Sequence, residues 1–312
     1  MKKLICCLLY GGLILVLTSG LSAQIKDDVS KSFKVNPGGE LVIKADLGSI
    51  DVKTHSKNSV DVDIRFRRKS RSRRDIEELL EDFDLEMNQN GNDVTIRFER
   101  IHDDWDFWNS VGKYLQVKFL ITVPTKYDLD LGTRGGSISV DDLEGKVFCK
   151  TSGGSLEFGN IKGDIDGNTS GGSINVDGCE GSADVHTSGG SIEIGHVKGN
   201  VKARTSGGGI HVDEVMGIID AVTSGGSVSA RITQQPKADC QLRTSGGGIT
   251  VAMTRDVKVD VDASTSGGRV YTDFPVMVRG ELSKRSLRAS INGGGPEIYL
   301  RTSGGSIHIE EL

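Results

Sequence analysis

One six-residue phrase returns along this chain at a fixed interval, and that interval limits the folds open to it. Phrases beginning Thr-Ser-Gly-Gly start at five positions, each 18 residues after the last: Thr151, Thr169, Thr187, Thr205 and Thr223. A related phrase starts at Thr133, and looser copies start at Thr244, Thr265 and Thr302. A short fixed period is typical of proteins whose repeats stack on one another. The sequence therefore predicts a rod of stacked coils.

The apolar residues around each phrase also keep a regular spacing. Val147 and Cys149 lie four and two residues before Thr151, while Leu156 and Phe158 follow its glycines. Alternation with period two indicates strands with one buried face. The inward parity reverses across each Gly-Gly pair, so we expect a sharp bend there, because a slip of one residue turns every side chain over. Glycine permits the positive φ angles and the close backbone approach that such a corner needs.

These patterns predict an all-β fold, a single-stranded parallel β-solenoid (β-helix) with about 18–21 residues per coil. A second corner is expected at Gly145 and at the glycines that follow it every 18 residues. The threonines face inward on this parity, and their hydroxyls can bond to one another or to backbone, which offsets the cost of burying them. The predicted structural residues are Thr151, Gly153, Gly154, Thr169, Gly171, Gly172, Thr187, Gly189, Gly190, Thr205 and Thr223.

The N-terminus predicts export. Residues 1–23 read as a signal peptide, with Lys2 and Lys3 before an apolar stretch and Ala23 at a small-residue cleavage site. A transmembrane anchor is the alternative, but the apolar stretch is shorter than the roughly 20 residues needed to span a bilayer. No second apolar span follows, so no transmembrane segment is expected after cleavage. The expected location is the periplasm, the outer-membrane surface or the extracellular space.

The remaining cysteines and the net charge narrow the function classes. Cys149, Cys179 and Cys240 all fall at inward positions of the repeat, where a thiol acts as a small hydrophobe. Their spacing is too wide for a metal site, and no cofactor motif is present. The net charge of −5 argues against a general nucleic-acid binder, which would carry a basic face.

Two regions follow from the pattern. Residues 24–131 form a β-rich segment, predicted to start or cap the solenoid, with one helix near 73–83; residues 132–312 form the repetitive solenoid. A Ser72/Asp75 pair resembles a helix capping box. A β-hairpin is expected to turn at Asn90-Gly91.

Two segments of the first region are candidate binding surfaces. Arg71, Arg73 and Arg74 can contact an anionic glycan or lipid headgroup, or can instead pair with the acidic face of the helix. Trp105 and Trp108 lie among aspartates, where aromatic rings can stack on sugars, grip a partner, or pack the loop onto the helix.

The C-terminal phrase runs almost to the last residue. We expect the final strand, Ile307–Ile309, to be the open edge of the stack. Open edges invite pairing with other chains, so edge-to-edge self-association is possible, with Glu310 and Glu311 opposing it.

The whole arrangement resembles a bacterial adhesin-like family, a domain of unknown function with a parallel β-solenoid. The resemblance covers nearly all of the chain after residue 23. Besides the Thr-Ser-Gly-Gly series, it is carried by Phe33-x-Val35 with Gly38-Gly39, Gly48-Ser49-Ile50-x-Val52, Ile121-x-Val123-Pro124 and Gly294-Gly295-Pro296-Glu297-Ile298. The resemblance implies the solenoid fold and an envelope location. It supplies no catalytic residues.

Three functions remain. The first is a non-catalytic, secreted or envelope-bound adhesin-like scaffold that binds an envelope protein or a glycan. The second is an envelope sensor or accessory protein that binds a membrane signalling partner. The third is a polysaccharide-acting β-helix enzyme, which would need paired carboxylates on one face. Outward acids do occur at Asp166, Asp184 and Asp220, although Lys202 interrupts their column.

Overall fold

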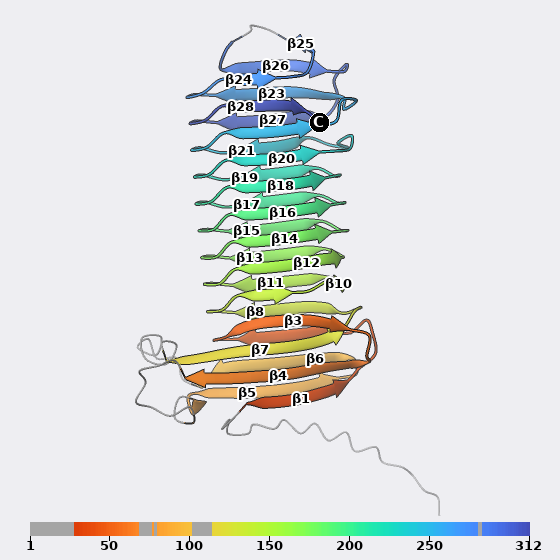
Figure 1. Ribbon diagram of the computed structural model, residues 1–312, viewed down its shortest axis with the longest axis vertical. Coiled ribbons are helices and arrows are strands. Elements are labelled where there is room, and N and C mark those ends of the chain that lie inside the picture. The colour runs from red at the N-terminus through yellow and green to blue at the C-terminus, as the bar shows by residue number, and fades with distance from the viewer. Residues whose placement is uncertain (1–27, 69–76, 78–79, 102–113, 280–282) are drawn as a thin grey trace, which may run out of the picture.

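A computed structural model describes residues 28–68, 77, 80–101, 114–279 and 283–312 of the chain. Over these residues the fold is all-β, with two 14-stranded sheets that lie face to face along the whole length of the molecule (Figure 1). Most neighbouring strands are parallel, and apolar side chains from both sheets form one continuous core between them. The predicted all-β fold built from parallel strands is confirmed.

The strands of the first sheet, sheet A, follow one another in space from the N-terminal end of the stack. They are β1 (Val29–Lys34), β4 (Ser59–Arg68), β7 (Leu115–Pro124), β3 (Ser49–His55), β9 (Ile138–Val140), β12 (Leu156–Lys162), β14 (Ile174–Cys179), β16 (Ile192–Val197), β18 (Ile210–Val215), β20 (Val228–Ile232), β22 (Ile249–Met253), β28 (Ile307–Glu311) and β24 (Val270–Thr272), with β10 (Leu143–Glu144) beside β12.

The strands of the second sheet, sheet B, are given in the same order, from the N-terminal end of the stack to the C-terminal end. Its strands are β5 (Phe83–Asn90), β6 (Asp93–Arg100), β2 (Glu40–Ala45), β8 (Asp128–Thr133), β11 (Val147–Thr151), β13 (Ile165–Thr169), β15 (Ala183–Thr187), β17 (Val201–Arg204), β19 (Ile219–Val222), β21 (Cys240–Arg243), β27 (Glu297–Thr302), β23 (Val259–Thr265), β26 (Ser286–Ile291) and β25 (Val276–Val278).

Each 18-residue repeat gives one strand to sheet B and the next strand to sheet A; we call such a pair, for example β13 with β14, a rung. Residues one repeat apart are register partners, as in Val147 with Ile165 and Leu156 with Ile174. All four of these side chains are buried, as the alternation predicts. A rung therefore places equivalent residues in straight columns along the stack.

The Thr-Ser-Gly-Gly phrase forms the corner between the two strands of a rung. The buried Thr169 hydroxyl donates to the carbonyl of Gly154 in the preceding rung at 2.7 Å, and Thr187 donates to Gly172 at 2.6 Å. Each threonine thus ties two rungs together with a backbone acceptor, and no threonine hydroxyl is left without a partner in this series.

The second glycine of the phrase is needed for space. A Cβ at Gly172 or Gly190 would overlap the backbone carbonyl of the preceding rung. The expected positive φ at this corner is wrong, because the described glycines with positive φ lie elsewhere, for example at Gly48 and Gly91. The parity reversal is achieved with ordinary φ values, and the close stacking of rungs is what excludes a side chain.

Antiparallel strands cover the N-terminal end. The predicted hairpin at Asn90-Gly91 joins β5 and β6, and β4 pairs antiparallel with both β1 and β7. Phe98 stacks on Phe83 at 4.5 Å between ring centroids and contacts Phe119 edge-on at 5.9 Å. Aromatic packing closes the stack where no further rung follows.

The C-terminal end differs from the prediction. The final strand β28 is not an open edge, because it lies between β22 and β24, and β27 likewise lies between β21 and β23. The Thr302 hydroxyl bonds to Gly247, and the Thr265 hydroxyl bonds to Gly305. The reason is that β26 pairs antiparallel with the outer side of β23, so the chain can return only on its inner side. The edge strands at this end are β24 and β25.

Some predictions fall outside the described residues. These are the signal peptide at 1–23 and most of the helix near 73–83. The predicted end of that helix is wrong, because Phe83 is the first residue of β5, where its ring packs on Phe98. The division between residues 131 and 132 stays a prediction. Within the described part of the chain, no helix has the length and apolar character to cross a membrane.

Candidate functional site

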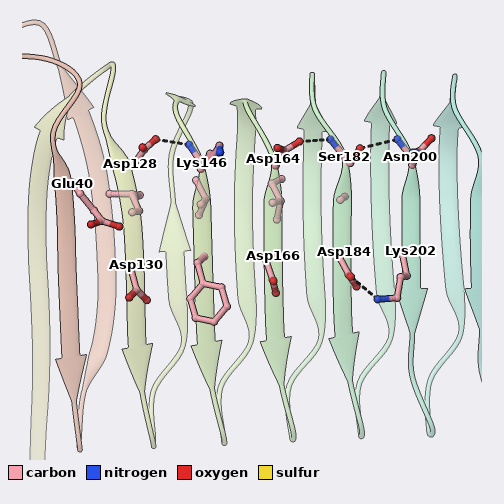
Figure 2. Close-up of a pocket in the computed structure, with 15 residues that line it drawn as sticks. Glu40, Asp128, Asp130, Lys146, Asp164, Asp166, Ser182, Asp184, Asn200 and Lys202 are labelled. Carbon is pink, nitrogen blue, oxygen red and sulfur yellow. Dashed lines mark hydrogen bonds and ion pairs between the residues drawn. The ribbon is translucent and has the colours of Figure 1, made fainter.

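The outer face of sheet B carries an open cavity of about 760 Å³, which we call the sheet B groove. Its lining side chains come from six neighbouring strands, β2, β8, β11, β13, β15 and β17. Figure 2 shows these side chains as two rows that run across the strands. The rows arise because every second residue of each strand points outward and equivalent residues stack in register.

The first row lies near the start of each sheet B strand and holds the backbone of the next rung. The Asp128 carboxylate accepts from the Lys146 amide at 2.7 Å, and the Asp164 carboxylate accepts from the Ser182 amide at 2.9 Å (Figure 2). The Ser182 hydroxyl in turn accepts from the Asn200 amide at 3.2 Å. These side chains satisfy backbone donors at the second corner, so their first task is structural.

The second row faces the middle of the groove, with one residue from each rung. It consists of Asp130, Phe148, Asp166, Asp184 and Lys202, which are successive register partners. Phe148 stands in a column otherwise filled by charged groups, and 38% of its surface is exposed. An exposed ring between two carboxylates is therefore the distinctive feature of this row.

Lysines neutralise two of the three carboxylates. The Lys44 ammonium lies 2.6 Å from the Asp130 carboxylate and 5.9 Å from the Phe148 ring centroid. Lys202 lies 2.6 Å from Asp184 at the other end of the row (Figure 2). These exposed pairs position the side chains more than they stabilise the fold.

Asp166 is the carboxylate that stays unpaired. Among the described residues, none forms an ion pair or hydrogen bond with its side chain. Partial burial raises the pKa of Asp166, the neighbouring Asp184 raises it further, and Lys202 opposes the shift. A carboxylate in this state gains from any ligand that brings a hydrogen-bond donor.

Two more lysines lie beside the ring along its own strand. Lys146 immediately precedes β11 and Lys150 lies within it, two residues before and after Phe148, and all three side chains are exposed. No described carboxylate lies within ion-pair distance of either ammonium. The ring is thus flanked by cations along the strand and by carboxylates across the strands.

A second, smaller groove on the outer face of sheet A has a different character. It has a volume of about 460 Å³ and is lined by Asp141, Glu157, Asn175 and Asp177. The aromatic residue at its floor, Phe158, is buried. Within the described ranges, no group of three or more His, Cys, Asp or Glu residues is arranged to hold a metal ion.

The predicted binding residues cannot be compared with this groove. Arg71, Arg73, Arg74, Trp105 and Trp108 lie outside the described residues. The predicted corner threonines and glycines line the joints between the sheets and do not reach the groove. Cys149, Cys179 and Cys240 are free and buried, and burial raises the pKa of the Cys179 thiol to about 11.

Sequence reasoning identified Asp166, Asp184 and Lys202 as an outward column but missed Phe148. The available signal was a break in that column, an aromatic residue where neighbouring rungs carry charge. The partner of Asp130 was also missed, because Lys44 comes from β2, which is 86 residues away in the sequence.

Comparisons with known proteins concern the whole chain. A family model described as Toastrack DUF4097 matches residues 40–310. No curated protein matches the chain.

Several solved structures are similar at low identity. A protein from Parabacteroides distasonis, described as a "putative adhesin", is 12% identical, with 93% of this chain and 98% of that chain covered and a TM-score of 0.43. A protein from Bacteroides fragilis with the same description is 12% identical, with 93% and 99% covered and a TM-score of 0.38. A second Parabacteroides distasonis protein, described as a "putative lipid binding protein", is 18% identical, with 91% and 96% covered and a TM-score of 0.40. Likenesses this distant carry no argument about the task of this chain.

Proposed function

Because the chain belongs to the Toastrack DUF4097 family, whose model matches residues 40–310, we propose that it is a non-catalytic, adhesin-like module of the cell envelope. In this proposal the chain is exported to the periplasm, the outer-membrane surface or the extracellular space. There it holds a glycan or an envelope protein against the outer face of sheet B. The observation that carries the proposal is the exposed Phe148 ring between the carboxylates of Asp130 and Asp166.

The rod itself suits such a module. We interpret the stack as a single-stranded parallel β-solenoid with coils of about 18–21 residues, supported by register partners one repeat apart. Solenoids present long regular surfaces, on which one ligand can touch several repeats. Threonine and serine bonds between rungs keep the columns straight, so the surface needs little ordering when a ligand binds.

The test is binding of the purified chain, residues 24–312, to isolated envelope fractions. Phe148→Ala should weaken binding by about tenfold, the size expected when a central aromatic contact is lost. Glu193→Ala, on the outer face of sheet A, is the matched control and should bind like the unchanged protein. If Phe148→Ala binds normally while Trp105→Ala or Trp108→Ala abolishes binding, the surface has been assigned wrongly.

The same fractions separate the alternative partners. Recovery of a membrane signalling protein on the immobilised chain would favour an envelope sensor or accessory protein. Binding that survives protease treatment of the fraction but not removal of its polysaccharide would favour adhesion to a glycan.

A polysaccharide-acting enzyme is the second candidate, because Asp166 and Asp184 are adjacent register partners and the pKa of Asp166 is raised. Glycosidases likewise use two carboxyl groups that lie close together on one face. The enzyme would release sugar from envelope polysaccharide, and Asp184→Asn would abolish the release. A reaction that depends on Asp184 would replace the non-catalytic proposal.

A further inference from the structure

Resting on the proposed function, we propose that the sheet B groove binds a linear glycan whose units carry amine or acetylated amine groups. The glycan lies along the stack, across the strands, with one sugar ring stacked on Phe148. Asp166 accepts hydrogen bonds from its nitrogen or hydroxyl groups. Lys146 and Lys150 donate to its oxygen atoms.

The shape of the groove favours a polymer. It touches six consecutive strands of sheet B, from β2 to β17. Strands in a sheet are about 4.8 Å apart, so the groove extends for about 24 Å along the stack. A single small molecule would fill only part of that length, whereas a chain of sugars can contact one rung after another.

The charges of the groove select against an anionic polymer. Six carboxylates line the groove, whereas four lysines lie in it or beside it. The carboxylates are Glu40, Asp128, Asp130, Asp164, Asp166 and Asp184, and the lysines are Lys146 and Lys202 in the lining with Lys44 and Lys150 next to it. A surface with this excess repels uronate or phosphate polymers and attracts a ligand that carries ammonium or polar N–H groups. Asp128 and Asp164 already accept backbone N–H groups, while Asp130 and Asp184 are paired with lysines.

Asp166 and Glu40 are thus the carboxylates left for a ligand among the described residues of the groove, and Asp166 lies directly beside the exposed ring. Phe148 and Asp166 are Cα partners on β11 and β13. A sugar that stacks its C–H face on the ring brings its equatorial substituents over the neighbouring strands. An aromatic platform with polar groups at its rim is the usual composition of a site that fixes a partly apolar ligand.

The position of the groove on the face of the sheet argues for a sugar chain over an extended peptide. Extended peptides gain affinity by adding to an open sheet edge through main-chain hydrogen bonds. The backbone of β11 is already paired on both sides, with β8 and β13. A peptide in the groove would therefore gain side-chain contacts only.

The experiment is calorimetric titration of residues 24–312 with four hexamers: glucosamine, N-acetylglucosamine, cellohexaose and galacturonate. The glucosamine and N-acetylglucosamine hexamers should bind, the glucosamine monomer should bind at least about tenfold more weakly than its hexamer, and galacturonate should not bind. Phe148→Ala should weaken hexamer binding by about tenfold, and Phe148→Trp should retain it. Asp166→Asn should weaken the glucosamine hexamer more than the acetylated one, because only the free amine forms an ion pair.

Control variants and ligands distinguish failure of the glycan assignment from failure of the proposed function. Phe148 and Asp166 are at the surface, so both variants should keep the melting temperature of the unchanged protein, and Glu193→Gln on sheet A should bind normally. If hexalysine binds as tightly as the glucosamine hexamer and Phe148→Ala changes neither, the groove recognises charge alone and the glycan assignment is wrong. If no hexamer binds while envelope fractions still bind in a manner that depends on Phe148, the ligand class is wrong and the adhesin-like function stands.

Discussion

At the scale of single residues, the glycine that matters most is the second of each Thr-Ser-Gly-Gly phrase. At Gly190, the carbonyl oxygen of Gly172 occupies the space that a Cβ would need. Because the obstacle is backbone of the preceding rung, neither side can move without separating the two rungs.

This contact predicts a large difference between two nearby positions. Gly190→Leu should destabilise the fold by at least about 3 kcal/mol, because it forces the rungs apart. Glu193→Leu, at an outward position of the same rung, should change stability by only about 0.5 kcal/mol. Thermal unfolding followed by circular dichroism compares them, and equal melting temperatures would contradict the corner geometry.

The buried threonines offer a second test. The Thr187 hydroxyl donates to the Gly172 carbonyl at 2.6 Å in a fully buried position. Thr187→Val keeps the volume but leaves that carbonyl without this donor, at a cost of about 1–3 kcal/mol. Thr187→Ser keeps the hydroxyl and should destabilise the fold less than Thr187→Val. A valine variant more stable than the original would show that the column acts only by filling space.

At the scale of strands, the last rungs are held by an ion pair between β27 and β23. Arg301 lies 2.7 Å from the Asp262 carboxylate, and both side chains are largely buried. Burial alone would raise the pKa of Asp262, but the hydrogen bonds and charges of Arg301 and Arg288 hold it below its usual value. The ionised form is therefore favoured in the folded state.

The sign of this shift fixes a pH dependence. As pH falls below about 5, the unfolded chain takes up a proton at Asp262 before the folded chain does, so stability falls until the folded pKa is passed. Asp262→Asn should lower the melting temperature at pH 7. Between pH 7 and pH 3, the melting temperature of this variant should fall less than that of the unchanged protein. A variant that follows the original curve in parallel would show that this carboxylate does not contribute.

The order of the last strands can be tested by cross-linking. His308 is the register partner of Thr250 on one side and of Tyr271 on the other. Cysteines placed at 250 and 308 should oxidise to a disulfide, since register partners lie within disulfide range. Cysteines at 250 and 271, two strands apart, should not. A disulfide between 250 and 271 would show that β24 pairs directly with β22, and it would contradict the placement of β28 between them.

The strand order shows where prediction from the sequence ends. Period two and the 18-residue repeat were enough to predict the strands, their inward residues and the corner positions, because each depends on local spacing. Which strands would stack on β21 and β22 was not predictable. The phrases at Thr244, Thr265 and Thr302 offer the same hydroxyl donors and the same glycine corners, so each could stack on any other. It is decided by the β25–β26 hairpin, whose sequence carries no repeat signal.

The candidate site was predictable only in part, for a related reason. The outward acids follow from the repeat, and Phe148 stands out once the columns are aligned. Glu40 lines the groove and Lys44 pairs with Asp130, and both come from β2, which is far away in the sequence, so no local pattern indicates the groove. Composition drew attention instead to the arginine and tryptophan segments, which lie outside the described residues.

At the scale of the whole molecule, rungs are interchangeable where they are identical. Removal of residues 170–187 deletes one full repeat and joins Thr169 to Ser188, which rebuilds the Thr-Ser-Gly-Gly phrase. The neighbours on both sides then meet in the same register, because β12 and β16 each pair with β14 in the same way. Stability should fall only by the share of one repeat.

A shorter deletion should do more harm. Removal of residues 170–178 takes away a corner and most of β14 but leaves β15, so the chain cannot return to sheet A in that rung. We expect the 18-residue deletion to give a soluble protein with a cooperative melting transition and the nine-residue deletion to aggregate. If both deletions gave a soluble, cooperatively melting protein, or if both aggregated, the rung would not be the unit that can be removed from the stack.

The position of β27 and β28, inside β23 and β24 in the stack, has a consequence for the order in which the protein folds. A ribosome delivers β23 and β24 before β27 and β28, yet the later strands lie between these and the body of the stack. At this end, β23 and β24 can therefore reach their final pairing only after β27 and β28 have been synthesised. A product that stops before Glu297 has β23 and β24 but lacks the strands that pair with them, so we expect proteases to degrade it faster than the full-length chain.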